Sequence, residues 1–104
     1  MEIVTVHKDI DAFVESLEDS AMGKVFRSFA LLRTFGYKLG LPHVRHLGQG
    51  MFELRIRDRQ EVRLFFAYRD GRVMILHGFQ KKTMQIQKHE LDLARKRLSS
   101  FDNT

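Results

Sequence analysis

The sequence has no cysteine, no tryptophan and a single proline. Without cysteine, the chain can form neither a disulfide framework nor a thiolate metal site, and it has no cysteine nucleophile, which favours a reducing compartment. No apolar run approaches the roughly 18 residues of a membrane span, and the first residues do not form the basic-then-apolar pattern of a secretory signal. We therefore expect a cytoplasmic protein, folded as one domain over residues 1–104.

Charge is unevenly distributed along the chain, which has a formal net charge of +5. Acidic residues crowd the N-terminal part, whereas lysine and arginine outnumber aspartate and glutamate between Arg45 and Lys82. A basic surplus of this kind favours a polyanionic partner such as nucleic acid, or an acidic protein.

Hydrophobic periodicity predicts an α+β, two-layer fold with the order β-α-α-β-β-β-α. A weak alternation predicts a strand over residues 2–6. Helical spacing of apolar residues predicts a helix capped by Asp9 or Asp11, and a second helix from about Met22 to a stop at Gly36. Its apolar stripe includes Phe26 and Phe35, which we expect in the core.

The second half of the chain predicts a connecting segment, three consecutive strands and a last helix. Residues 37–50 contain three glycines and the only proline, which predicts a connection with room for one helical turn. Strands are predicted over residues 51–57, 61–68 and 72–79, with a tight hairpin at Asp70-Gly71. Residues 85–101 predict an amphipathic C-terminal helix.

The register of these strands can be predicted, because residues opposite each other share a face of the sheet. A three-residue loop at positions 58–60 produces a fully apolar face from three pairs: Phe52 with Phe66, Leu54 with Leu64, and Ile56 with Val62. The same register places Arg55 directly opposite Arg63, and Arg57 opposite Glu61 as an ion pair. A two-residue turn at Asp70-Gly71 then pairs Leu64 with His77 and Arg63 with Gly78, which puts Gln80 and Lys82 on the arginine side.

Two arginines in direct opposition are the most informative feature of this pattern. Like charges facing each other destabilise a sheet, whereas an anion between them reverses the sign of the interaction. Guanidinium groups offer a planar fork that suits phosphate oxygens. We therefore predict a phosphate site at Arg55 and Arg63, with no carboxylate between them. The alternative is that both side chains extend into water, or that Glu53 bridges to Arg55 along the same face.

Three parts of the sequence are similar to a known family: Gly50-Met51-Phe52-Glu53-Leu54-Arg55, the later Arg63, and Leu76-His77-Gly78-Phe79-Gln80-Lys81-Lys82-Thr83 followed by Glu90, Ala94 and Arg97. In this order they resemble the phage-derived HigB-type branch of the RelE/ParE toxin superfamily. The resemblance implies a RelE-like fold, with two N-terminal helices packed on an antiparallel sheet and a C-terminal amphipathic helix. One departure is that relatives usually continue with Thr-Pro where this chain has Met84-Gln85-Ile86-Gln87.

The resemblance also implies an activity and partners. It implies the toxin of a type II toxin–antitoxin pair, an mRNA interferase that cleaves messenger RNA in the ribosomal A site. The partners are then a cognate antitoxin, the ribosome and its messenger RNA, and neither a metal nor another cofactor is required. The runner-up is a ParE-like protein that inhibits DNA gyrase without catalysis, or an inactive relative that only binds nucleic acid or protein.

The expected endoribonuclease chemistry uses the ribose 2′-hydroxyl, which attacks the adjacent phosphate, so the enzyme must align the chain and stabilise charge. Arg55 and Arg63 are the predicted phosphate clamp, matching strand positions where RelE-like enzymes carry basic catalytic residues. Lys82 is the candidate that protonates the leaving oxygen or adds electrostatic stabilisation. Lys81 is predicted to bind the RNA backbone, although the two lysines could exchange roles. Further RNA contacts are predicted for Arg57, Arg45 and His46.

The histidines suggest two other roles, a general base and a zinc site. His77 could be a general base, because imidazole titrates near neutral pH, but its predicted place beside Leu64 favours a structural, hydrogen-bonded role. His43 and His46 lie three residues apart, yet a zinc site would need a further ligand nearby, so no metal site is predicted. The paired arginines together with Lys82 favour the nuclease over the gyrase inhibitor, because a protein-binding toxin needs no phosphate clamp.

Overall fold

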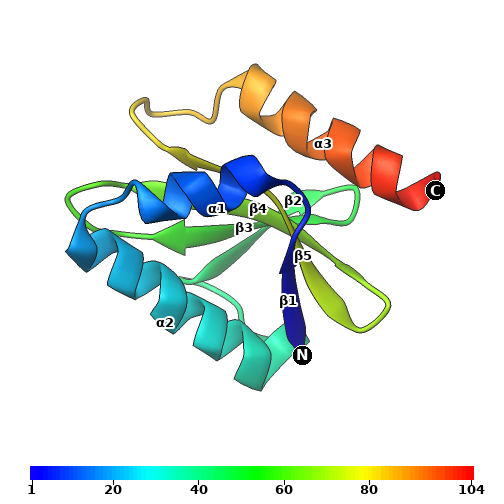
Figure 1. Cartoon of the computed structure of the whole chain (residues 1–104), viewed down its shortest axis with the longest axis horizontal. Coiled ribbons are helices and arrows are strands. Elements are labelled where there is room, and N and C mark those ends of the chain that lie inside the picture. The colour runs from blue at the N-terminus through cyan, green and yellow to red at the C-terminus, as the bar shows by residue number, and fades with distance from the viewer.

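A five-stranded sheet forms the centre of the molecule (Figure 1), whose computed structural model describes residues 1–104. The spatial order of the strands is β1-β5-β4-β3-β2. β1 runs parallel to β5, and the other neighbours are antiparallel. In chain order the elements are β1 (Glu2–Thr5), α1 (Lys8–Glu15), α2 (Asp19–Phe35), the 3-10 turn η1 (Gly36–Lys38), β2 (Val44–Gly48), β3 (Met51–Ile56), β4 (Val62–Arg69), β5 (Arg72–Gln80) and α3 (Lys88–Asp102).

The predicted α+β class and the arrangement of helices on a sheet are confirmed. The structure adds one strand, β2, within the segment that was predicted only to connect, and η1 supplies the helical turn for which that segment had room. None of the helices has the length and apolar character required to cross a bilayer.

The two N-terminal helices begin differently from the prediction. α1 is capped by His7, whose Nδ1 accepts a hydrogen bond from the Asp9 amide at 3.1 Å, so the expected aspartate cap is wrong. α2 begins at Asp19 and ends, as predicted, at Gly36, whose φ of +52° favours glycine. Phe26 and Phe35 are 55% and 49% exposed, because the buried stripe of α2 runs instead through Ala21, Val25, Ser28, Phe29 and Leu32.

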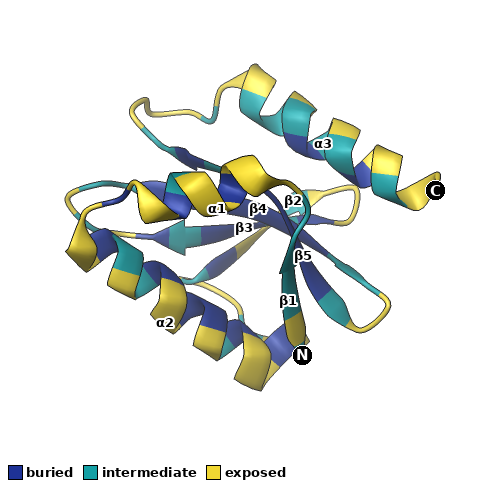
Figure 2. Ribbon diagram, in the orientation of Figure 1, coloured by how far each residue is buried: buried dark blue, intermediate teal, exposed yellow.

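The two faces of the sheet are covered to different extents (Figure 2). α1 and α2 pack on one face over a cluster of 15 buried apolar residues, whereas α3 covers the other over a cluster of only seven. We call these the α1/α2 face and the α3 face. The smaller cluster means that α3 leaves part of its face open, which is where polar side chains gather.

The register of β3 and β4 is as predicted: Phe52 pairs with Phe66, Leu54 with Leu64, Ile56 with Val62, and Arg55 with Arg63. The hairpin at Asp70-Gly71 is also confirmed, with positive φ angles of 54° and 71° at its two residues. The predicted continuation is wrong, because a bulge between Phe65 and Phe66 leaves Leu76 as an extra residue in β5.

This bulge exchanges the two faces for the rest of β5. His77 now pairs with Phe65 and Gly78 with Leu64, so His77 lies on the α3 face and Gly78 on the α1/α2 face. A Cβ atom on Gly78 would lie 2.6 Å from Leu64 Cδ2 and 2.9 Å from Phe13 Cδ2. Gly78 therefore permits α1 to pack closely on the sheet, and the predicted pairing of Gly78 with Arg63 on the arginine side is wrong.

Polar contacts hold α3 against the sheet at its middle and at both ends. In the middle, Arg97 donates to the Leu76 carbonyl at 2.9 Å and also contacts Asp9. This bond satisfies a backbone group of the bulged residue. At the N-terminal end His77 Nε2 lies 2.9 Å from Glu90 Oε1.

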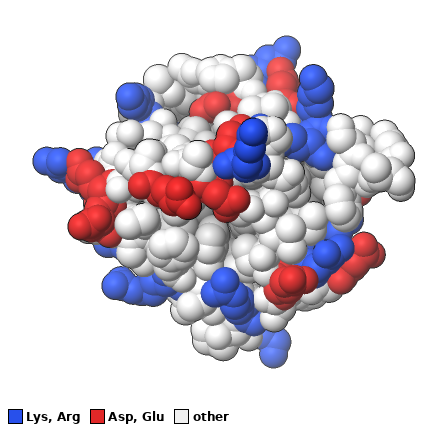
Figure 3. Space-filling view, viewed as in Figure 1, with Lys and Arg blue, Asp and Glu red and all other residues white.

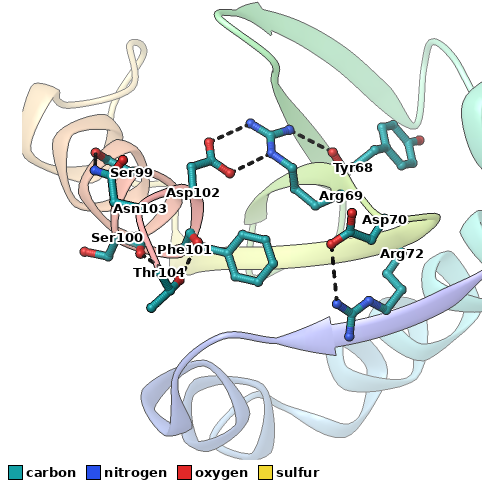
Figure 4. A network of polar contacts seen from close by, with 10 residues as sticks. All are labelled: Tyr68, Arg69, Asp70, Arg72, Ser99, Ser100, Phe101, Asp102, Asn103 and Thr104. Atoms are coloured by element: carbon teal, nitrogen blue, oxygen red, sulfur yellow. Dashed lines mark hydrogen bonds and ion pairs between the residues drawn. The ribbon is translucent and has the colours of Figure 1, made fainter.

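The C-terminal end of α3 is held by an arginine (Figure 4). Arg69 donates from Nε and Nη2 to the two carboxylate oxygens of Asp102, at 2.8 and 3.0 Å. Hydrogen bonding to Arg69 lowers the pKa of Asp102, and hydrogen bonding to Arg97 lowers the pKa of Asp9. Both carboxylates are therefore stabilised in their charged form when α3 is docked.

Candidate active site

The open part of the α3 face contains a hollow of about 580 Å³, which we call the basic groove. It lies where the loop between β3 and β4 meets the segment that follows β5. Its lining residues are Arg55, Arg57, Glu61, Arg63, Lys81, Lys82, Thr83 and Met84. Five of these eight are cationic, so the predicted gathering of positive charge at the ends of β3, β4 and β5 is present.

A buried carboxylate lies at the base of this cluster. Glu53 is only 1% exposed and contacts three arginines from three strands. Its Oε1 lies 3.3 Å from Arg45 Nε and 3.8 Å from Arg55 Nε, and its Oε2 lies 3.6 Å from Arg63 Nε. The prediction that no carboxylate lies between Arg55 and Arg63 is therefore wrong, and the alternative in which Glu53 bridges is the one observed.

The direction of these contacts decides which guanidinium atoms remain available. All three arginines approach Glu53 through Nε. Arg45 and Arg55 make no other side-chain hydrogen bond or ion pair, so both terminal nitrogens of each are free to donate to a ligand. Two parallel N–H groups form the fork that binds a phosphate or carboxylate. Three cations around one carboxylate also leave an excess of positive charge.

Arg63 is more deeply placed than Arg55. Its side chain is 4% exposed, against 21% for Arg55. Its Nη1 donates to Glu61 Oε2 and to the Val62 carbonyl, both at 3.0 Å. Arg63 therefore contributes positive charge at the floor of the groove while its Nη1 is already engaged. The predicted pair of Arg57 with Glu61 is replaced by this contact, and Arg57 has no carboxylate partner.

The two lysines occupy the rim of the basic groove. The Lys81 amide donates to the Glu61 carbonyl at 2.7 Å, which ties the segment after β5 to the start of β4. Because Arg63 pairs with Phe79, alternation places Lys81 on the arginine side and not Lys82, which reverses the prediction. Both nevertheless line the groove, since β5 ends at Gln80 and the chain turns away.

The remaining predicted site residues are not all brought to the groove. Arg45 lies on β2, opposite Glu53 of β3, and is therefore one strand away from Arg55. His46 pairs with Phe52 and packs edge-on against its ring at 4.4 Å between centroids, on the α1/α2 side of the sheet. His77 is held by Glu90 and stacks on Phe79 at 5.5 Å, and it does not line the groove.

No group of three histidine, cysteine, aspartate or glutamate side chains is placed to hold a metal ion. Two carboxylates lie at the site without having been predicted as site residues: Glu53, which was considered only as a bridge to Arg55, and Glu61, which was expected to pair with Arg57. The signal for Glu53 was its alternation with Leu54, which puts it on the same face as Arg55. Its burial could not be found in this way, because that depends on arginines from two other strands.

Comparison with family models identifies residues 12–99 as a phage-derived Gp49-like protein. This match covers most of the 104-residue chain. The chain belongs to the Gp49-like family. A comparison with curated proteins finds no match. The Gp49-like family is RelE-like and toxin-like, which confirms that part of the resemblance seen in the sequence and implies an antitoxin partner.

Proposed function

We propose that this Gp49-like protein is a HigB-type toxin of a type II toxin–antitoxin pair, with residues 1–104 as a single RelE-like domain. It acts in the cytoplasm as an endoribonuclease on messenger RNA in the ribosomal A site. The observation that carries the proposal is the basic groove, where the free terminal nitrogens of Arg55 adjoin Arg57, Lys81 and Lys82. None of these last three side chains is paired with a carboxylate, so the groove has charge available for a polyanion.

The positions of the cations suit the cleavage of RNA by its own 2′-hydroxyl. The 2′-oxygen attacks the adjacent phosphorus, the bond to the 5′-oxygen breaks, and a 2′,3′-cyclic phosphate is left. Arg55 holds the phosphoryl oxygens through its terminal nitrogens, and Arg63 adds its charge from the floor. Neither step needs a metal, because the guanidinium groups carry the charge that builds up on phosphate.

Proton transfer is assigned to the groups at the rim. Lys82 or Lys81 donates a proton to the departing 5′-oxygen, and their shared rim position leaves the choice to experiment. Glu61 is the only carboxylate that lines the groove, so it is the candidate acceptor for the proton of the 2′-hydroxyl. His77 is assigned a structural role, since its Nε2 is engaged by Glu90.

RNA outside the scissile phosphate is bound by Arg57, which lines the groove, and by Arg45, which lies on the neighbouring strand β2. Arg57 also lines a second hollow of about 240 Å³ between β3 and α2. His46 is the weakest of the RNA-binding candidates, because its ring packs on Phe52. The antitoxin silences the toxin by covering the basic groove or a sheet edge with an acidic or apolar segment.

Mapping of RNA ends in cells after brief induction tests this function. Wild-type protein is expected to produce new 5′ ends inside translated reading frames, and Arg55→Gln is expected to abolish them. Arg59→Gln is the matched control. Arg59 lies in the loop before β4, pairs with Glu18 at the start of α2, and does not line the groove. Intact messenger RNA with gyrase-linked DNA breaks would contradict the proposal and support a ParE-like activity.

A further inference from the structure

A smaller hollow of about 300 Å³ adjoins the basic groove, and we call it the side pocket. Lys81 and Met84 line both, so the two hollows share a wall. The side pocket lies between β2 and the first turns of α3, and the segment before α3 contributes several of its residues. Its lining is Arg45, Leu47, Lys81, Met84, Gln85, Ile86, Leu91 and Arg95.

The lining of the side pocket differs in chemistry from that of the groove. Leu47, Ile86 and Leu91 are partly buried and pack against the core of the α3 face, which makes a fixed apolar surface. The groove has only one apolar lining residue, Met84, whereas half of the side pocket is apolar. An inorganic anion would gain nothing from that apolar surface, but a flat ring would bury area against it.

Polar groups at the side pocket are placed to engage the edge or face of such a ring. Gln85 offers an amide with two donors and one acceptor. Arg45 approaches Glu53 through Nε, so its terminal nitrogens remain free on this side. Arg95 has an Nε that is buried without any hydrogen-bond partner. An unpaired buried donor is costly, and an acceptor from a ligand would remove that cost.

We propose that the side pocket holds the nucleobase next to the scissile phosphate. The inference rests on the proposed function, and it adds a second contact on the same RNA strand. The phosphate lies in the basic groove beside Lys81, and the adjoining base enters the side pocket. There the base packs on Leu47 and Leu91, and the polar atoms of its edge contact Gln85 and Arg95. Other proteins bind single-stranded RNA with cations along the backbone and with bases stacked on aromatic or guanidinium surfaces.

The size of the side pocket favours one base at a time. Its volume is at the lower end of the range of small-molecule sites, roughly 300–1,000 Å³. Because Gln85 can present either a donor or an acceptor, the side pocket is also expected to discriminate among bases. The preference for one nucleotide beside the cut would then depend partly on this protein and not only on the ribosome.

Nuclear magnetic resonance on the isotope-labelled full-length protein tests the inference without ribosomes. The probes are the four nucleoside 5′-monophosphates and ribose 5-phosphate, which has the same phosphate and sugar but no base. All five are expected to shift the resonances of Lys81. Only the nucleotides are expected to shift the methyl groups of Leu47 and Leu91 and the side-chain amide of Gln85. Equal effects of ribose 5-phosphate and the nucleotides on those groups would overturn the inference.

Two variants separate this inference from the proposed function. Arg95→Met keeps the length of the side chain but removes its donor, and Gln85→Ala changes an exposed residue outside the helices. Each is expected to weaken nucleotide binding by about tenfold, which corresponds to about 1.4 kcal/mol for one hydrogen bond. Binding of ribose 5-phosphate should stay as in the wild type. Lys96→Met, the adjacent exposed position on α3 outside the side pocket, is the matched control.

On ribosomes, the same two variants should still cut messenger RNA but with a changed preference for the base beside the cut. An unchanged preference together with wild-type nucleotide binding would overturn the side pocket while leaving the nuclease in place. If the wild-type protein cleaves no messenger RNA, the proposed function is wrong, whatever the side pocket binds.

Discussion

The two faces of the sheet differ in what they bury, although the same strands form both. The α1/α2 face is continuous and apolar, with Leu54, Leu64 and Phe66 fully buried beneath two helices. The α3 face has a smaller apolar cluster, and beside it Glu53 and Arg63 are buried as charged groups. Even paired buried charges contribute little net stability, because the cost of desolvation offsets their attraction. One face therefore accounts for most of the stability, whereas the other keeps charge ready for a ligand.

Acidic and basic side chains gather at different places on the surface (Figure 3). Over the α1/α2 side, acidic side chains form a row where α1 lies (Figure 3), and Asp9, Asp11 and Glu15 are exposed there. The groove on the α3 side has the opposite sign. A polyanion is thus repelled from the surface of α1 and attracted to the groove.

The largest expected effect comes from removing one buried group from each face. Glu53→Ala leaves the buried Arg63 without this carboxylate and is expected to lower the free energy of unfolding by about 3–5 kcal/mol. Leu64→Ala is expected to cost about 2–5 kcal/mol by leaving a cavity. Urea unfolding measures both costs. The rate of RNA cleavage per folded molecule should fall only for Glu53→Ala. Equal rates for the two variants would remove the functional difference between the faces.

A smaller effect is expected at the glycine where α1 meets the sheet. Gly78→Ala places a Cβ against Leu64 and Phe13 and should destabilise by about 1–3 kcal/mol. Gly23→Ala is the matched control, since nothing lies within 4 Å of its Cβ and it sits in α2, where alanine should stabilise by about 0.5–1 kcal/mol. Thermal melting of both variants decides the matter, and a Gly78→Ala protein as stable as the wild type would contradict the close packing described.

The smallest effect is a loosening of α3 in acid. Asp9 and Asp102 have a pKa below their ordinary value of 3.8, because Arg97 and Arg69 hydrogen-bond to them. Their contribution to stability is complete above that value and is lost as the pH falls below about 4. Hydrogen exchange should therefore show that the amides of α3 lose protection before those of α2, which rests on the larger apolar cluster. Simultaneous loss in both helices would contradict this order.

Much of the apolar framework could be predicted from the sequence. The alignment of Leu54 with Leu64 fixes the register that opposes Arg55 to Arg63, because a shift of one residue would bury an arginine under α1 and α2. Asp70-Gly71 fixes the next hairpin by its positive φ angles. β2 was not predicted because it is short, follows Pro42 and ends at Gly48.

The arrangement of the candidate site was less predictable, for two physical reasons. A bulge at Leu76 has no local sequence signal, and its carbonyl is satisfied by Arg97 from a helix far along the chain. That single extra residue moved His77, Gly78 and the two lysines to faces other than those predicted. The burial of Glu53 likewise depends on arginines from three strands, which only the folded chain brings together.

The most direct test of the claim that the basic groove cuts RNA is a single-turnover cleavage rate on ribosomes programmed with a defined messenger. Arg55→Gln removes a phosphate-binding fork and is expected to slow cleavage per folded molecule by about 100-fold or more. Arg59→Gln, which alters an arginine outside the groove, should cut at the wild-type rate. Cleavage by Arg55→Gln at the wild-type rate would contradict the account.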